Sequence, residues 1–533
     1  FDIVLSHTCP YKYIPREMFL PFVDQSKVDN SMELFLDKIE ESISYDKWYC
    51  GHYHTEKEID KIEFMYERIK KFKKLYLEFG GKLFDDLHAA RVLPGFDPNI
   101  KTKLLMKLKD KAEIIFCISA NDIEKNRIRA DLGLSYDNEM LRLIDNLRGL
   151  GLYVSSIVIT LFKGQPSAMK FAQKLENHGE KVYFHKYTKG YPSEVDIIVS
   201  DEGYGANPYI ETTRPLVVVT APGPSSGKLA TCLSQMYHDF KHGIKSGYAK
   251  FETFPVWNLP LKHPVNIAYE AATADLKDVN QIDPYHFNAY GVLTVNYNRD
   301  IEVFPVLKNI LKKITGKEIY KSPTDMGVNM VASAIIDEDV VINAAKKEVV
   351  RRYFRTECDY KRGQASFDTV ERIRYLMAEL DLTPDFLPVV NPAKMISKES
   401  GYPCVALELP NGEIVYGKSK KIISASGAVI LNALRTLAGL GDDFDIISDD
   451  ILMPIVKLRT EYLHSKCGVL TVDDVLIALA ISSHSNDKAK KAIDCLPKLS
   501  GCEAHATYIL SPAEEQSLKK IGINISCQPI FLN

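Results

Sequence analysis

The clearest pattern in the chain is a series of short apolar runs between residues 113 and 221, which alternate with longer segments of helical periodicity. The runs are rich in β-branched residues and predict buried strands. Two intervening segments, "NEMLRLIDNLRGLG" and "SAMKFAQKLENHG", predict helices that end at glycine. Strands that alternate with helices predict a parallel sheet covered on both faces. The predicted strands are 113–119, 153–160, 181–185, 195–200 and 216–221.

Residues 1–72 are predicted to form a separate N-terminal part. The stretches "FDIVLS" and "KWYC" predict two strands, and Asn30 and Glu33 have the spacing of a capping box for a helix around residues 31–45. After a first unit that ends at residue 56, the apolar positions of residues 57–72 recur at helical spacing, so we predict a connecting helix there. These positions are Ile59, Ile62, Met65, Ile69 and Phe72.

The rest of the chain is too long for a single hydrophobic core. Near the C-terminus, Asn411 and Gly412 predict a hairpin turn, and Ser424 predicts a helix N-cap. The segment "LTPDFLPVVNPAK" has three prolines and predicts a linker. The predicted fold class is multi-domain α/β, with a P-loop- or Rossmann-like, mostly parallel sheet domain over residues 73–318, a helical segment over 319–382 and a separate α/β domain over 383–533.

Composition and charge narrow the functional classes. The 533 residues carry a formal net charge of −3, which gives no electrostatic argument for nucleic acid or an anionic membrane as a partner. No apolar run approaches the roughly 18 residues that span a bilayer. The ten cysteines are scattered along the chain, as is typical of reduced thiols in a cytoplasm. We therefore expect a cytoplasmic protein that binds neither nucleic acid nor membrane, and a homo-oligomer is compatible with the sequence.

The stretch "LVVVTAPGPSSGK" combines an apolar run, a turn rich in Gly, Ser and Pro, and a lysine that opens a predicted helix. Such a turn presents backbone N–H groups and the positive end of a helix dipole to an anion, and the lysine adds a point charge. Two positions depart from the Walker A pattern, because Pro222 replaces its first glycine and Leu229 replaces the magnesium-binding Ser or Thr. Thr231, one helical turn beyond the lysine, is the candidate substitute. The residues predicted to cradle phosphate are Gly223, Ser225, Ser226, Gly227 and Lys228.

Upstream of this loop, the apolar run of residues 195–200 ends in Asp201 and Glu202, which resemble the acidic pair of a Walker B segment. Such a pair holds a metal ion or orients a water molecule in phosphoryl transfer. ATP or GTP with Mg²⁺ would be the matching cofactor, although no residue identifies one. The alternative interpretation, which stays open, is a structural Gly-Ser turn beside a surface acidic pair.

Several stretches are distinctive enough to compare with known proteins, among them "LYLEFGGKLFDDLHAARVLPGFDP", "KFETFPVWNLPLKHPVNIAYEAATADLKDVN" and "VNYNRDIEVFPVLK". From about residue 68 to the C-terminus, the chain closely resembles a bacterial family known as domain of unknown function 1846. The resemblance implies an α/β N-terminal domain, a helical middle and a separate α/β C-terminal domain. It implies no reaction.

The first of these stretches is rich in groups that do chemistry. Behind the glycine pair of "GGKLFDDLHAAR" follow Lys82, Asp86, His88 and Arg91. Glycine pairs let a backbone approach a ligand closely, and clustered cations suit phosphate or carboxylate. We predict that Lys82 and Arg91 help to bind an anionic ligand and that Asp86 and His88 take part in catalysis. The alternative is ion pairing between domains.

The first fifty residues suggest a different relationship. The stretches "VLSHTCP" and "WYCGHYHTE" resemble the C-terminal end of calcineurin-like metallophosphoesterases. The resemblance implies that His7, His52 and His54 correspond to metal ligands. The other metal-binding segments of that family are absent from the chain, and three histidines cannot hold two metals in its way. We therefore expect a truncated remnant over residues 1–56, without a bound metal and without phosphoesterase activity.

Two half-sites of zinc-like spacing occur near the C-terminus, His464 with Cys467 and Cys502 with His505. A zinc site would require both pairs to meet in space. The alternative that we favour is a buried cysteine and a hydrogen-bonded histidine in each pair.

Taken together, the sequence predicts a protein that binds a nucleotide or another small phosphorylated ligand at the "GPSSGK" loop. Lys228, Asp201 and Glu202 would then serve phosphoryl transfer or hydrolysis. Two alternatives stay open: a non-catalytic ligand-binding or assembly protein, and a metal-dependent phosphoesterase activity of residues 1–56.

Overall fold

The computed structural model of this chain describes most of its 533 residues. The described residues are 3–6, 8–14, 30–44, 47–50, 58–59, 62–64, 73–129, 134–328, 332, 335–419, 422–441, 446–464 and 468–532.

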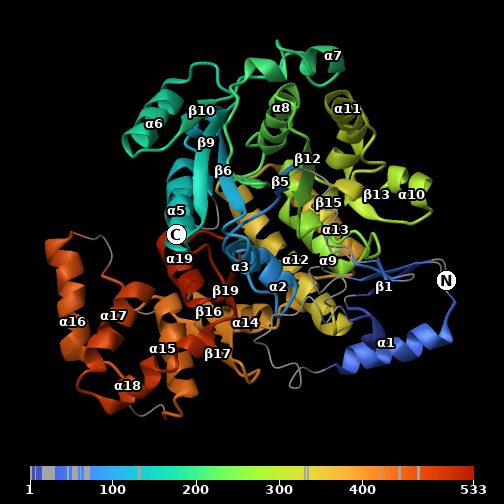
Figure 1. Cartoon of the computed structure of the whole chain (residues 1–533). Coiled ribbons are helices and arrows are strands. Elements are labelled where there is room, and N and C mark those ends of the chain that lie inside the picture. Colours follow the sequence, from blue (N-terminus) through green and yellow to red (C-terminus); the bar gives the residue numbers. More distant parts are fainter. Residues whose placement is uncertain are drawn as a thin grey trace.

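A seven-stranded sheet forms the centre of the molecule (Figure 1), and each of its strands runs parallel to its neighbours. The strand order is β10-β9-β6-β11-β5-β12-β15. The strands are β5 (Lys74–Phe79), β6 (Ala112–Ser119), β9 (Tyr153–Thr160), β10 (Val182–Phe184), β11 (Leu216–Thr220), β12 (Ser246–Phe251) and β15 (Gly327–Val328).

Helices cover both faces of this sheet, as the sequence predicts. Along β6, Ile114, Phe116 and Ile118 pack into the core under α3 (Ile100–Lys107), α5 (Tyr136–Gly149) and α6 (Pro166–Asn177). The alternate residues Ile115 and Cys117 pack into the core under α7 (Val195–Ile198), α8 (Lys228–Lys241) and α11 (Asn298–Thr315). In Figure 1, α5 and α6 lie on the left, beside β9 and β10, whereas α8 lies above β5 and β12, with α11 to its right.

The order of the strands creates a crevice at the carboxyl edge of the sheet. The chain leaves β6 toward the face that carries α5, whereas it leaves the neighbouring strand β11 toward the face that carries α8. Where the connections of adjacent parallel strands diverge in this way, open α/β sheets bind their ligands. The loop of residues 221–227 lies at this divergence, between β11 and α8.

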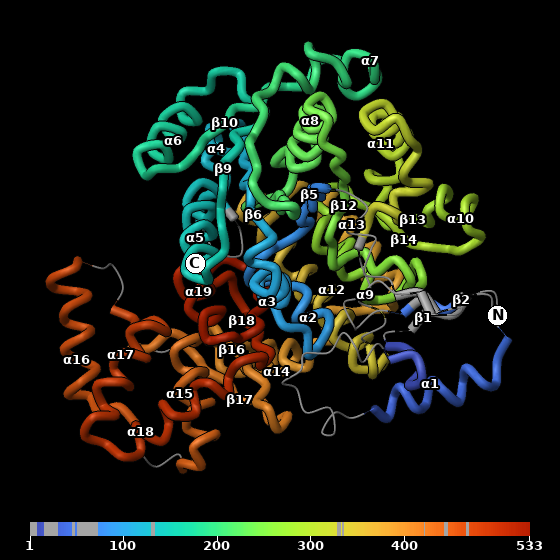
Figure 2. Tube along the Cα trace, in the orientation of Figure 1, coloured from blue at the N-terminus to red at the C-terminus, as the bar shows by residue number. Residues whose placement is uncertain are grey.

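A layer of helices follows in the middle of the chain. It contains α2 (Leu87–Val92), α9 (Pro264–Ala272), α12 (Glu338–Lys361), α13 (Phe367–Glu379) and α14 (Val390–Ser400). The longest of these, α12, contacts α2 and α9 as well as β19 (Asn524–Cys527) near the C-terminus. Figure 2 traces α12 between the sheet and the C-terminal part, so this helix joins the two.

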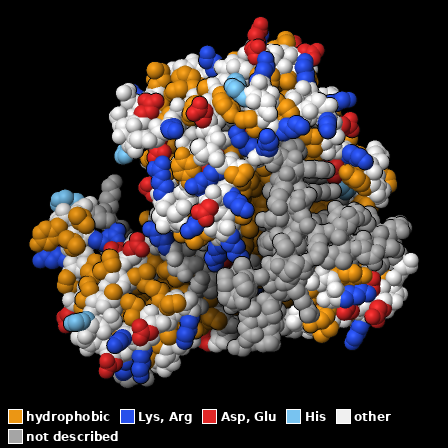
Figure 3. Space-filling model, viewed as in Figure 1, with side chains coloured by type: hydrophobic (Ala, Val, Ile, Leu, Met, Phe, Trp, Pro, Cys, Tyr) orange, Lys and Arg blue, Asp and Glu red, His pale blue; other side chains and the backbone are white. Residues whose placement is uncertain are grey.

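Residues beyond α14 build a second, four-stranded sheet of order β17-β16-β18-β19. Its strands β16 (Cys404–Glu408) and β17 (Ile414–Lys418) form the predicted hairpin, with Gly412 at φ +84° in the turn. Ser424 caps α15 (Ala425–Leu437) as predicted, because its side chain accepts a hydrogen bond from the N–H of Gly427. The other elements are α16 (Asp449–Lys457), α17 (Val472–Ser482), α18 (Asp487–Ile493), β18 (Glu503–Ala506) and α19 (Pro512–Ile521). Figure 3 shows hydrophobic side chains exposed over this part, at its lower left.

Short elements complete the architecture. Two small antiparallel pairs, β7 with β8 and β13 with β14, extend the loops of the central sheet. The elements are α4 (Ala120–Glu124), β7 (Ile128–Arg129), β8 (Leu134–Ser135), β13 (Asn280–Ile282), α10 (Pro284–Tyr290) and β14 (Val295–Tyr297). Within the described ranges, no helix combines the length and apolarity needed to cross a membrane.

The predicted connecting helix over residues 57–72 is wrong in its described part. Glu58–Ile59 form β3 and Ile62–Phe64 form β4, in a sheet with β1 (Ile3–Ser6) and β2 (Lys47–Cys50). Helical spacing of apolar residues is a local pattern, and here the pairing of β4 with β2 overrides it.

The helix α1 (Ser31–Ser42) forms where it is predicted, but its capping box does not. The side chain of Asn30 makes no cap hydrogen bond to the helix. Glu33 instead accepts a hydrogen bond from the hydroxyl of Thr8 over 2.8 Å, so it ties the helix to the preceding loop.

Two further predictions fail. Residues 195–198 form the helix α7 and not a strand, and the predicted linker contains the start of α14. Leu387, Val389 and Val390 are fully buried, so this segment is held by packing against the helical layer. Two central strands, β5 and β12, carry Lys74, Glu78 and Lys250 among their apolar residues. Because of these charged residues, the hydrophobic pattern did not predict either strand.

A buried ion pair fixes α8 against the sheet. Asp239 of α8 is fully buried and accepts hydrogen bonds from Lys74 Nζ (3.0 Å) and the Tyr76 hydroxyl (2.9 Å) of β5, and from the Tyr209 hydroxyl (2.8 Å). Removing one partner of a buried pair leaves the other charge without compensation.

We predict that Asp239→Ala lowers the free energy of unfolding by about 3–5 kcal/mol, because Lys74 then stays buried and unpaired. Urea denaturation followed by circular dichroism measures the change. Asp201→Ala is the matched control, since Asp201 is an exposed carboxylate that also contacts α8, and its midpoint should stay close to that of the wild type. Equal loss in both variants would contradict the role of the buried pair.

Candidate functional site

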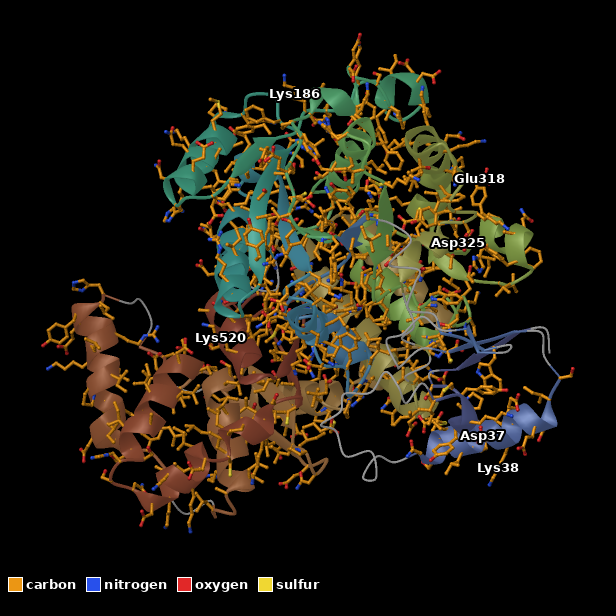
Figure 4. All side chains as sticks on the ribbon, viewed as in Figure 1. Asp37, Lys38, Lys186, Glu318, Asp325 and Lys520 are labelled. Atoms are coloured by element: carbon orange, nitrogen blue, oxygen red, sulfur yellow. The ribbon has the colours of Figure 1, made fainter. Side chains whose placement is uncertain are left out.

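A cavity of about 1230 Å³ lies at the carboxyl edge of the central sheet. Its walls include the loop after β11, the residues that follow β5 and β12, the helices α2 and α12, and α19 of the C-terminal part. Fourteen Lys and Arg residues line it against nine Asp and Glu residues, so its lining is cationic although the chain as a whole is slightly acidic. Lys520, labelled in Figure 4, lies on α19 in this lining.

The loop between β11 and α8 presents backbone amides that the fold itself leaves unused. Lys228 is the first residue of α8, and the preceding Gly227 has φ +80°, which favours glycine. Within the described part of the chain, none of the loop amides from residue 223 to residue 228 donates a hydrogen bond of normal length and angle, although the turn at Pro224 and Ser225 brings the Ser226 N–H toward the carbonyl of Gly223. These amides belong to Gly223, Ser225, Ser226, Gly227 and Lys228, since the two prolines of the loop have none.

Two side chains of the loop also lack partners among the described residues. The Ser226 hydroxyl is buried without a hydrogen bond, in a residue that is 3% exposed and lines the cavity. Lys228 is half-buried, lines the cavity and forms no ion pair with any described residue. Amides, hydroxyl and ammonium together form a set of hydrogen-bond donors with no acceptor.

Close packing holds this loop in place. The backbone carbonyl of Ser226 accepts a hydrogen bond from Thr160 Oγ1 over 2.8 Å. A Cβ atom at Gly223 would stand 2.2 Å from the ring of Tyr136, and one at Gly227 would stand 2.9 Å from the side chain of Thr160. A side chain at either position would collide with these neighbours, so the packing around the loop requires both glycines.

Thr231 does not join the loop. It is fully buried and absent from the cavity lining, and its hydroxyl contacts the Cys117 thiol and the His185 ring, each at 3.5 Å. Burial lowers the pKa of His185 to about 3. Thr231 thus packs α8 onto β6, and the proposal that it replaces the magnesium-binding residue of a Walker A loop is wrong.

Asp201 and Glu202 lie away from the loop as well. Asp201 accepts a hydrogen bond from the Tyr237 hydroxyl (2.7 Å) and pairs with Lys241 (3.2 Å), the last residue of α8. Because α8 has 14 residues, its two ends are about 20 Å apart. Glu202 is exposed and pairs with Lys189. The predicted Walker B pair is therefore a surface acidic pair, as the alternative interpretation had it.

The segment after β5 lines the cavity with groups that are already paired. Asp86 caps α2 and forms a buried ion pair with Lys101 Nζ at 2.9 Å, and the same ammonium donates to the carbonyl of Lys82. Sequence reasoning missed Lys101, which is 2% exposed. With its charge neutralised in this way, Asp86 has a structural role in this state of the protein.

Charged residues also connect the sheet to the C-terminal part through α12. Glu348 accepts two hydrogen bonds from Arg91 (2.8 and 2.9 Å) and one from Arg351 (2.7 Å), and Arg351 also pairs with Glu503 of β18. Burial favours the neutral form of Glu348, but the two arginines outweigh it and hold the pKa of this carboxyl well below its usual range. Arg91 therefore takes part in ion pairing between domains, which was the alternative interpretation of its role.

His88 belongs to the same network. Its Nδ1 lies 3.2 Å from Glu348 Oε1, and its Nε2 is buried without a hydrogen-bond partner among the described residues. Burial lowers the pKa of His88, which favours the neutral ring. With Nδ1–H donating to the carboxylate, Nε2 carries the lone pair of the neutral ring and is itself buried. The prediction that His88 takes part in chemistry stays open.

A further cluster of charged side chains lies at the carboxyl end of β12. Lys250 Nζ lies 2.5 Å from Asp300 Oδ2 and 2.8 Å from Glu252 Oε1, and Arg299 pairs with Asp278 at 3.3 Å. All five residues line the cavity. The sequence singled out none of Lys250, Glu252 or Asp278, because charges separated along the chain form no recognisable motif.

No metal centre emerges from the described residues, in which no group of three or more potential ligands is found. His7, His52, His54 and Cys467 lie outside the described residues. Cys502 is buried, and its thiol lies 3.7 Å from the carbonyl of Lys498. Both ring nitrogens of His505 have partners, Ser526 at 2.8 Å and Gln528 at 3.0 Å.

Comparison with known proteins gives two consecutive matches along the chain. The family described as "Domain of unknown function DUF1846, N-terminal" matches residues 52–381, and its C-terminal counterpart matches residues 385–533. A UPF0371 protein of Clostridium tetani (strain Massachusetts / E88) is 56% identical over 481 residues, which cover 89% of this chain and 96% of that protein. A UPF0371 protein of Clostridium botulinum (strain Alaska E43 / Type E3) shows the same identity and coverage. Neither the family match nor these relatives support the relationship to metallophosphoesterases that the pattern of residues 1–56 suggested.

The ion-pair network predicts a pH-dependent stability. We expect Glu348→Gln to lower the free energy of unfolding by about 3 kcal/mol, because two arginines lose their buried carboxylate. A carboxyl whose pKa is depressed in the folded state stabilises the protein above its unfolded pKa, near 4.3, and this contribution is lost as the pH falls through the folded value. Urea denaturation between pH 3.5 and 8 should show a constant difference from the wild type down to about pH 5 and a smaller one below about pH 4. A difference that grows on acidification would contradict this assignment.

Proposed function

This chain belongs to the DUF1846 family, and we propose that it binds a small phosphorylated ligand in its central cavity, with the phosphate on the loop of residues 223–228. The observation that carries the proposal is the set of donors without acceptors: five backbone amides, the Ser226 hydroxyl and the Lys228 ammonium. Of these donors the Ser226 hydroxyl is buried, and buried polar groups are almost always satisfied in folded proteins. A phosphate group has enough oxygen atoms to accept from all of them.

The position of the loop supports the same proposal. It lies at the N-terminus of a 14-residue helix, where the helix dipole favours an anion. It also lies where the connections of adjacent parallel strands diverge, the place where open α/β sheets bind ligands. This arrangement has the layout of a P-loop- or Rossmann-like domain, and we propose that classification for residues 73–318.

The positions of the two candidate magnesium-binding groups indicate the class of ligand. Thr231 is buried under the sheet and Asp201 lies at the far end of α8, so neither is in place to hold Mg²⁺ beside a nucleotide. The donors that remain at the loop are backbone amides and one ammonium, and such a set suits the phosphate group of an ester. We therefore propose a small phosphorylated metabolite in preference to a magnesium nucleotide.

The test is the affinity for inorganic phosphate and for sugar phosphates, measured by isothermal titration calorimetry. We predict that Lys228→Ala weakens binding at least tenfold, because a hydrogen bond to a charged group contributes about 1.5–3 kcal/mol. Lys241→Ala is the matched control, since it removes a lysine from the opposite end of the same helix and should leave the affinity unchanged.

Ser226→Ala separates binding from folding. The wild-type hydroxyl is buried without a partner, so its removal should leave the melting temperature unchanged or slightly higher. The same variant should bind phosphate more weakly. Wild-type protein that binds none of these ligands, or a Lys228→Ala variant that binds them as well as the wild type, would refute the proposed function.

A further inference from the structure

The strongest unassigned feature of the cavity is the carboxylate of Glu252, beside the proposed phosphate site. Three adjacent strands are in register at Val219 of β11, Glu78 of β5 and Lys250 of β12. Two residues further along each strand direction stand Ala221, Gly80 and Glu252. The loop after β11 and Glu252 after β12 therefore lie at the same edge of the sheet and at the same height along the strands. Between them lies β5, which is followed by Gly80.

The missing side chain at Gly80 determines where Glu252 lies. A Cβ atom at Gly80 would stand 2.5 Å from Glu252 Cγ and 2.7 Å from Oε1, so the carboxylate occupies the space above this glycine. Since β5 lies between β12 and β11, the carboxylate leans toward the loop. Neighbouring strands are about 4.8 Å apart, so β11 and β12 lie roughly 10 Å apart on either side of β5. The loop and Glu252 line the same cavity.

The surroundings of Glu252 favour proton transfer near neutral pH. Burial and the nearby charge of Asp300 raise the pKa of Glu252 to about 7, although Lys250 opposes this shift. The charged and titratable groups that surround it are Glu78 of β5, Lys250 of β12, Tyr269 of α9, Tyr297 of β14, and Arg299 and Asp300 of α11. A carboxyl group that is half ionised at pH 7 can both accept and return a proton.

Lys250 supplies a fixed cation beside this base. Its ammonium has three donors, of which Glu252 and Asp300 accept two. The third has no acceptor among the residues that the structure describes. A donor held in this way stabilises negative charge that develops on a substrate oxygen.

We propose that Glu252 is the catalytic base for a phosphate ester that carries a carbonyl group, with the phosphate on the loop and the carbonyl oxygen at Lys250. Glu252 takes the proton from the carbon next to the carbonyl. The electron pair of that C–H bond forms a C=C bond, and the carbonyl π pair moves onto the oxygen, which accepts a hydrogen bond from Lys250. Return of the proton from Glu252 to the same carbon restores the starting carbonyl compound. Where that carbon carries a hydroxyl group, its O–H proton can instead pass to the oxygen held by Lys250 while Glu252 protonates the former carbonyl carbon, which gives the isomer, so the step needs no other reactant. This inference rests on the proposed phosphate binding.

The test is hydrogen exchange in deuterium oxide, followed by proton NMR, with dihydroxyacetone phosphate, ribose 5-phosphate and fructose 6-phosphate as probes. We expect a probe that binds in a Lys228-dependent way to exchange a carbon-bound hydrogen. Glu252→Gln should slow this exchange about 100-fold or more while binding of the same probe is retained, because general-base catalysis contributes 10²–10⁴-fold.

Gly80→Ala gives a second test, because the added methyl group displaces the Glu252 carboxylate without removing it. This variant should also exchange the hydrogen more slowly than the wild type. Probes that bind through Lys228 but exchange no hydrogen, or exchange at the wild-type rate in Glu252→Gln, would overturn the assignment of Glu252. If neither these probes nor inorganic phosphate bind the wild-type protein, the proposed function fails first and this inference fails with it.

Discussion

The register of β11, β5 and β12 is the constraint on which the rest of the structure depends. Parallel strands bring their carboxyl ends to one edge of a sheet, and here this edge carries the loop before α8, the exit at Gly80 and the exit at Glu252. A shift of one residue between β5 and β12 would place Glu78 and Lys250 on opposite faces of the sheet. The buried contact between Asp239 and Lys74 fixes α8 to β5, so it also fixes the level at which the loop opens into the cavity.

The charges around the cavity fall into two groups with different roles. Asp86 pairs with Lys101 and so joins α2 to α3. Glu348 and Glu503 together balance Arg91 and Arg351, and these four residues hold α2, α12 and the C-terminal part together. Lys228 forms no such pair among the described residues, although it lines the same space. A half-buried lysine that lines a cavity without an ionic partner agrees with the proposed binding of an anionic ligand.

Membership of the DUF1846 family covers nearly the whole described architecture, with the matches meeting between α13 and α14. The cavity extends across this point, because residues of both matched ranges line it. Glu348 and Glu503 illustrate the consequence, since the same Arg351 binds both. The two matched parts of the chain therefore both contribute to the wall of the cavity.

The sequence by itself determined the elements whose signals are local. The alternating runs of residues 113–119 and 153–160 became strands of a parallel sheet, the "GPSSGK" turn became a loop before a helix, and Asn411 with Gly412 became a hairpin turn. Hydrophobic periodicity and turn chemistry act over a few residues, so they can be recognised without a fold.

Only the tertiary structure decided which charged residues share a space. It separated Asp201 from Lys228 by the length of α8, buried Thr231, and brought Lys250 and Glu252 next to a loop that precedes them by more than twenty residues. Strand order and register set these distances, and both arise from packing between segments far apart in the chain.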